Sequence, residues 1–256
     1  MASHHRTPGK RLVSEPKTIV YEESPRWIRG YYQDTKVVDS KKAYLVWEGT
    51  NHIPFWAFPI QDISGLEPNN NKDSGKEGIR DRWYDLKIGS ETISNFAWTT
   101  RKDTPGFIPG AEEVAIVASQ KLDRWLEDDE TVYGHPRSPY ARIDVRASSR
   151  HVRVDIDGVT VAETTNAIFL YENGLPARYY INTIDVKRID LFHPVSLNTV
   201  CPYKGTASYF SAVVNGKDYE NVVWTYLEPF EGLERVKGRW CFYNEKLDVY
   251  VDGEKA

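Results

Sequence analysis

The sequence has few of the residues that build metal, redox or disulfide centres. Of its 256 residues only Cys201 and Cys241 are cysteines, and neither lies in a Cys-x-x-Cys spacing. A structural zinc site needs more ligands than this. Both cysteines fall in the second half of the chain, at positions where the first half has none. We therefore expect two free thiols, no metal and no cofactor.

Long apolar runs and a broad excess of positive charge are also missing. No stretch approaches the roughly 18 apolar residues of a membrane-spanning helix, and residues 1–20 lack the apolar core of a signal peptide. The net charge is −4, with acidic and basic residues interleaved, which is unlike a nucleic-acid-binding surface. We expect a cytoplasmic protein, monomeric or homodimeric, with no nucleic-acid or membrane partner.

What the sequence does contain is one segment twice. Residues 26–48 align without a gap on residues 150–172, and apolar positions match apolar positions almost throughout. The match resumes where residues 95–99 align with residues 221–225. Such self-similarity indicates two diverged copies of one domain, each of an ordinary domain size.

This repeat sets the expected domain boundaries. We assign residues 1–20 to a flexible tail, 21–134 to the first domain and 151–256 to the second. The prolines near the start of residues 135–150 favour an extended linker between the copies. Residues 67–78, rich in asparagine, lysine and glycine, indicate a solvated loop in the first copy.

Signals for β-strands dominate both copies. Asp157-Gly158 and Asn215-Gly216 are typical of tight hairpin turns. The one candidate helix is residues 120–129, whose apolar residues recur at three- and four-residue spacing. We predict an all-β chain with minor α content, built as two tandem small β-sheet domains of a sandwich-like kind. The expected strands are residues 27–38, 43–48, 151–163, 167–172, 207–214, 222–226 and 237–243.

The densest polar signal is the turn at residues 201–205. It gathers the thiol of Cys201, the phenol of Tyr203 and the ammonium of Lys204, held by turn residues. A neighbouring lysine favours a thiolate, so Cys201 is a candidate nucleophile, and His193 could be its base. The alternative is a buried thiol in a tight turn, which the sequence favours.

Glu172 is a candidate general base, because it ends an apolar strand where burial would favour proton transfer. The same acid recurs as Glu48 in the first copy. That recurrence favours a structural alternative, in which Glu172 pairs with Arg178 or caps a turn.

A cluster of aromatic residues in the second copy indicates a binding pocket. Most aromatic residues of a small sheet fill its core, but the strand alternation turns some of them outward. Outward rings near Arg178 and Lys204 would suit a planar, anionic small molecule. We expect the pocket to include Tyr180, Tyr209, Trp224 and Tyr226.

The order of residues 178–180, 201–205, 224–226 and 242–245 resembles the family called domain of unknown function 427, in its tandem form. The resemblance covers about residues 26–253. It implies a compact β domain, related to tent-like folds that present an aromatic pocket on one sheet face. The family name implies no activity. The first copy lacks the Cys-Pro-Tyr-Lys-Gly turn, so we expect a working site in the second copy alone.

A nucleotidyltransferase label is sometimes attached to this family, but the residues do not support it. Asp155 and Asp157 would set two carboxylates on one strand face, as that chemistry uses, but they flank a hairpin turn where acids are common. No phosphate-binding loop accompanies them.

The sequence thus predicts a protein that binds a small anionic or carbonyl-bearing metabolite in its second copy. If it is an enzyme, the parts suit cofactor-independent isomerisation or elimination, with Glu172 as base and Tyr203 or Lys204 stabilising the oxyanion. The alternatives are a non-catalytic ligand-binding or sensing module, a protein-interaction scaffold, and a thiol enzyme at Cys201.

Overall fold

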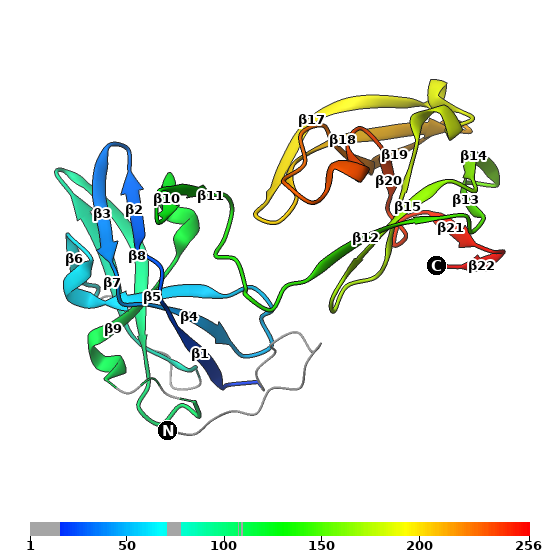
Figure 1. The fold of residues 1–256 in the computed structure, drawn as a ribbon. Helices are drawn as coiled ribbons and strands as arrows, with labels where there is room; N and C mark the ends of the chain where they lie inside the picture. The colour runs from blue at the N-terminus through cyan, green and yellow to red at the C-terminus, as the bar shows by residue number, and fades with distance from the viewer. Residues whose placement is uncertain (1–15, 71–77, 107, 109) are drawn as a thin grey trace. The chain divides into compact units, whose positions relative to one another are not determined.

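A computed structural model describes residues 16–70, 78–106, 108 and 110–256 of the chain. The chain divides into two compact domains, one ending at Tyr140 and the other running from Ala141 to Ala256. In Figure 1 the first domain runs from blue to green and the second from green to red.

The first domain consists of two antiparallel sheets. Its large sheet has seven strands in the order β1-β4-β5-β9-β8-β7-β6, and its small sheet has four in the order β11-β10-β2-β3. The strands are β1 (Ile19–Ser24), β2 (Ile28–Tyr32), β3 (Thr35–Ser40), β4 (Ala43–Glu48), β5 (Phe55–Pro59), β6 (Leu66–Pro68), β7 (Arg80–Ile88), β8 (Glu91–Thr100), β9 (Val114–Val117), β10 (Arg124–Glu127) and β11 (Glu130–Val132).

The second domain repeats this plan strand for strand. Its large sheet has the order β12-β15-β16-β20-β19-β18-β17 and its small sheet the order β14-β13-β21-β22. The strands are β12 (Ile143–Ser148), β13 (Val152–Ile156), β14 (Val159–Thr164), β15 (Ala167–Glu172), β16 (Arg178–Ile181), β17 (Phe192–Cys201), β18 (Gly205–Val214), β19 (Lys217–Tyr226), β20 (Trp240–Phe242), β21 (Asp248–Val251) and β22 (Glu254–Lys255).

The all-β, duplicated fold expected from the sequence is confirmed. Substituting β12 for β1, and so on to β22 for β11, converts one strand order into the other. The helical segments of the described residues are short 3-10 turns. No helix in this part of the chain has the length and apolar character to cross a membrane.

The β13–β14 hairpin shows how alternation directs side chains. Val152, Val154 and Ile156 are buried in the core between the two sheets of the second domain. The intervening residues point outward, as a period of two requires. Asp157 and Gly158 close the hairpin with φ values of 50° and 77°, which a primed two-residue turn requires.

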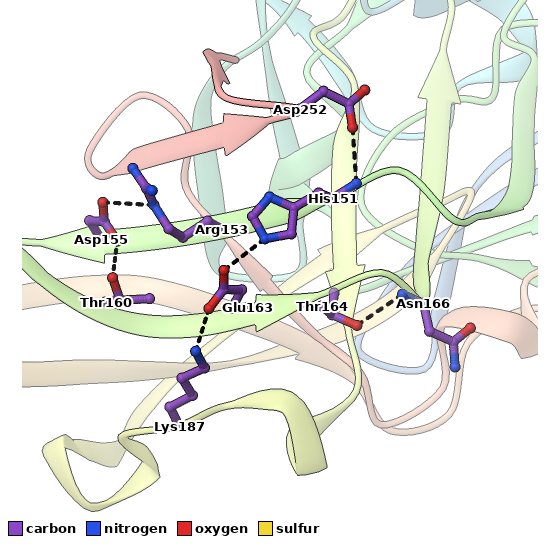
Figure 2. Close-up of polar contacts among 9 residues, drawn as sticks. All are labelled: His151, Arg153, Asp155, Thr160, Glu163, Thr164, Asn166, Lys187 and Asp252. Carbon is purple, nitrogen blue, oxygen red and sulfur yellow. Dashed lines mark hydrogen bonds and ion pairs between the residues drawn. The ribbon is translucent and has the colours of Figure 1, made fainter.

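Polar and charged side chains pair with one another on the outward face of this small sheet. His151 Nε2 lies 2.7 Å from Glu163 Oε1, and Lys187 also bonds Glu163 (Figure 2). Arg153 Nε lies 3.1 Å from Asp155 Oδ2. Such solvent-facing pairs each contribute little to stability.

Both faces of the large sheet of the second domain carry buried apolar side chains. One face packs on the small sheet, and Tyr179 and Val223 point to this side. The other carries a separate apolar cluster that includes Tyr180, Trp224 and Tyr226. Neighbours on one strand therefore lie in different clusters, and the second cluster places aromatic side chains around a site.

Several expectations differ from the structure. The predicted helix at 120–129 is a 3-10 turn, Ser119–Lys121, followed by strand β10. Pairing with β2 and packing of Trp125 on Trp56, with centroids 4.6 Å apart, override the helical spacing.

The expected tail ends in a strand, and the expected linker contains a whole one. Ile19 and Val20 lie in β1, which pairs with β4, and β12, which pairs with β15, lies within residues 135–150. The expected loop at 67–78 begins with β6, and its residues 71–77 lie outside the described part of the chain.

Candidate functional site

The second domain has a cavity of about 200 Å³ on the face of its large sheet that carries the aromatic cluster. It is walled by apolar and aromatic side chains with three charged groups among them. The lining residues are Leu170, Glu172, Leu175, Pro176, Arg178, Tyr180, Lys204, Tyr209, Trp224, Tyr226 and Tyr243.

Strand alternation explains why residues far apart in sequence meet here. Leu170 and Glu172 are two residues apart on β15, as Arg178 and Tyr180 are on β16, so each pair points to one face. Trp224 and Tyr226 repeat this spacing on β19. In register, Tyr209 of β18 lies opposite Trp224.

Lys204 and Glu172 form an ion pair in the cavity wall. The Lys204 Nζ lies 2.7 Å from Glu172 Oε2, and the side chains are 14% and 6% exposed. The turn fixes Lys204, because its N–H donates to the Cys201 carbonyl at 3.3 Å and its own carbonyl accepts from Phe230 at 3.2 Å. Glu172 pairs with Lys204 here, whereas the sequence suggested Arg178.

Gly205 makes this turn possible. Its φ is +101°, and a Cβ there would lie 2.9 Å from the Glu228 carbonyl oxygen. Only glycine adopts such a conformation at low cost. The backbone of β18 can therefore pass close to residue 228 while Lys204 is directed at Glu172.

The first domain has the same acid at the same place but pairs it with an arginine from a different strand position. Arg80 Nη2 lies 2.7 Å from Glu48 Oε2, and Trp98 Nε1 donates to Glu48 Oε1 at 2.6 Å. The Arg80 guanidinium carbon stacks 3.8 Å from the centroid of Trp98. In register, Ala207 occupies the position of Arg80 in the second domain.

Tyrosine hydroxyls supply most of the remaining polar groups. Trp224 Nε1 donates to the Tyr180 hydroxyl at 3.1 Å, and the Tyr243 ring lies 4.5 Å from the Trp224 ring. Burial raises the pKa of Tyr180 and of Tyr226 well above the ordinary value. Burial and a hydrogen bond with Tyr209 raise the pKa of Tyr243 to about 12. These phenols are therefore neutral hydrogen-bond donors at physiological pH.

Arg178 pairs with a residue that the sequence did not single out. Its Nη1 and Nη2 donate to Glu245 at 2.9 and 2.7 Å, and its guanidinium carbon lies 5.4 Å from the Trp224 centroid. Burial lowers the pKa of Arg178, but the hydrogen bonds to Glu245, together with neighbouring Cys241 and Tyr243, raise it overall. The same hydrogen bonds lower the pKa of Glu245.

Two of the expected catalytic residues are not in the cavity lining. Cys201 is partly buried at the end of β17 and pairs in register with Gly205. Tyr203 is partly buried in the turn. His193 is exposed near the opposite end of the ten-residue strand β17, so the structure does not bring it to Cys201.

The sequence reasoning missed Tyr243 and Glu245, although both lie in the segment that carries the family resemblance. The sequence indicated only that these residues match the family's order, and it gave neither of them a role. Leu175 and Pro176 follow the end of β15 in a short turn. Nothing in their local sequence indicates a site.

The carboxylates considered for nucleotide chemistry are paired with other groups. Asp155 accepts from Thr160 Oγ1 at 2.8 Å and pairs with Arg153 (Figure 2). Asp157 pairs with Lys217 at 3.1 Å. Among the described residues, no three His, Cys, Asp or Glu side chains are grouped as metal ligands would be.

Comparison with known proteins bears on both domains. One family model, described as domain of unknown function (DUF427), matches residues 20–128 and again residues 144–253. A comparison with curated proteins finds no match. The two matched segments correspond to the two domains of the structure.

Proposed function

Because the chain belongs to the DUF427 family, whose description names no activity, we propose its function from the second domain's cavity: this domain binds a small organic molecule that is anionic or carries a carbonyl group. The observation that carries the proposal is the cavity itself, which combines aromatic walls with an excess of hydrogen-bond donors.

The chemistry of the lining supports a ligand rich in acceptors. Lys204, Arg178 and the neutral phenols all donate, and Glu172 is the one carboxylate among the lining residues. Pockets of this kind bind through apolar contact and use a few polar groups for orientation. The volume of about 200 Å³ equals that of roughly seven water molecules, which suits a molecule with a single ring.

Binding takes precedence over catalysis in this proposal. A buried acid–cation pair is present in both domains, as Glu172 with Lys204 and as Glu48 with Arg80. A pair that recurs in both domains, with lysine in one and arginine in the other, is explained by a structural role. Acid/base isomerisation or elimination is a second candidate, because Glu172 and Lys204 line the cavity together.

The test is native mass spectrometry of freshly purified protein. Leu175 lines the cavity and is 45% exposed, so Leu175→Trp blocks the cavity at little cost to folding. Leu227, 57% exposed and outside the cavity lining, provides the matched control Leu227→Trp. We expect a bound mass in the wild type and in Leu227→Trp that Leu175→Trp loses. A mass retained equally by all three proteins would reject this cavity as the site.

The two free thiols also support our proposal that the protein works in a reducing compartment such as the cytoplasm.

A further inference from the structure

We propose that the molecule bound in the second domain is a carboxylate, and that its carboxylate group replaces Glu245 as the partner of Arg178. This inference rests on the proposed function and narrows it, because it selects a carboxylate over a neutral carbonyl compound and names the residue that sets this preference.

Arg178 already binds a carboxylate in the structure, that of Glu245. Both terminal nitrogens of Arg178 donate to Glu245, one to each carboxylate oxygen. This two-point contact matches the planar guanidinium fork and is the form in which arginine recognises carboxylates. Arg178 is in the cavity lining and Glu245 is not.

Exposure places Glu245 on the solvent side of this pair. The Arg178 side chain is 19% exposed, whereas that of Glu245 is 51% exposed. The arginine is therefore fixed between the Trp224 ring and Glu245, and the glutamate can swing into water at low cost. A ligand carboxylate that reaches Arg178 compensates the charge that Glu245 leaves behind, so the exchange strands no buried ion.

The first domain shows that the fold does not need this ion pair. In the second domain Arg178 lies opposite Leu170. In the first domain Phe55 lies opposite Val46, the equivalent of Leu170. Lys246 donates to the Asn221 carbonyl, and Lys121 donates to the equivalent carbonyl of Asn95. Glu245 and Gln120 each precede one of these lysines, so they occupy equivalent positions. The first domain therefore has phenylalanine and glutamine where the second has Arg178 and Glu245.

The Arg178–Glu245 pair is thus specific to the second domain, where Arg178 lines the cavity. The fold itself does not require the pair, since the first domain forms without it. A role at the cavity explains the pair: Glu245 is a built-in counter-ion that keeps Arg178 charged and oriented over Trp224 until an anion arrives.

Neutralising Glu245 should therefore increase affinity for carboxylates alone. Glu245→Gln preserves the shape and one acceptor oxygen but removes the competing charge. Benzoate and benzamide are suitable probes, since they share a ring and a size and differ in charge. Calorimetric titration of the full chain should show benzoate binding to Glu245→Gln about tenfold more tightly than to the wild type. Benzamide affinity should stay the same.

The matched control is Glu163→Gln, which changes the net charge equally at an ion pair on the small sheet (Figure 2). It should leave the affinity for benzoate unchanged. The increase in Glu245→Gln should also shrink at high salt, because it is electrostatic. Thermal unfolding of each variant separates this effect from a loss of folding.

The outcomes distinguish this inference from the proposed function. Equal binding of benzoate and benzamide, both blocked by Leu175→Trp, would preserve the binding function and reject the carboxylate. Benzoate binding that weakens in Glu245→Gln would show that Glu245 only positions Arg178, and would overturn the exchange. Absence of benzoate binding to both wild type and Glu245→Gln would also contradict the inference.

Discussion

Replacing Lys204 by methionine should destabilise the second domain strongly. The change keeps an unbranched side chain in the turn but removes the ammonium that lies 2.7 Å from Glu172. At an effective dielectric constant of about 20, charges at this separation attract by about 6 kcal/mol. Desolvation offsets part of this attraction. Because the Glu172 side chain is only 6% exposed, we expect the loss of its ammonium partner to cost roughly 3–5 kcal/mol.

Two further variants show whether the cost arises from burial of the charge. Lys237 pairs with Glu228 at 2.9 Å, but these side chains are 55% and 84% exposed. Lys237→Met should therefore cost less than about 1 kcal/mol. The double variant Lys204→Met with Glu172→Leu removes both buried charges and should recover most of the stability that Lys204→Met loses.

Urea denaturation of the full chain measures these differences, analysed as two transitions because each domain can unfold separately. A cost below about 1 kcal/mol for Lys204→Met would show that the pair is solvated, and our account of the cavity wall would then be wrong. A double variant less stable than Lys204→Met would equally contradict the argument.

Three other predictions concern the turn, the thiols and the phenols. Gly205→Ala should cost about 1–3 kcal/mol of stability, and more than Gly216→Ala, since φ is positive at both but of the two only Gly205 has a backbone atom within 3 Å of the added Cβ. Equal losses of stability in urea denaturation would contradict the close approach. Cys241 is fully buried and burial raises its thiol pKa, whereas Cys201 is partly exposed. A thiol reagent should therefore label only Cys201 in the folded protein and both cysteines in urea, and rapid labelling of both in the folded protein would refute the buried position of Cys241. Since burial raises the pKa of Tyr180, Tyr226 and Tyr243, these phenols stay protonated between pH 7 and 9, and benzoate affinity should not change over this range. A tyrosinate absorbance that appears between pH 7 and 9 and is lost in Tyr243→Phe would contradict this prediction.

The fold could be predicted largely because the sequence contains two copies of the same domain. Alternation at Val152, Val154 and Ile156, and positive-φ turns such as Asp157-Gly158, are local signals that need no tertiary information. The failure at residues 120–129 has the opposite cause. Leu122 and Trp125 are spaced as on a helix, but both are buried in a core built by strands from elsewhere in the chain, and that packing decides the local conformation.

The candidate site could be predicted in part. The sequence analysis expected a pocket that includes Tyr180, Trp224 and Tyr226, and the structure places these side chains around one cavity. Strand alternation does not show which charged residues pair. Lys204 meets Glu172 and Arg178 meets Glu245 across 32 and 67 residues of sequence, and only the sheet register brings these partners together.

The most direct test of the central claim is a thermal-shift screen of small organic acids and their neutral amides against the wild type, Leu175→Trp and Leu227→Trp. We predict that acids with a single ring raise the unfolding temperature of the wild type and of Leu227→Trp, and leave that of Leu175→Trp unchanged. Equal shifts in all three proteins, or none in any, would contradict a ligand site between Trp224, Arg178 and Lys204.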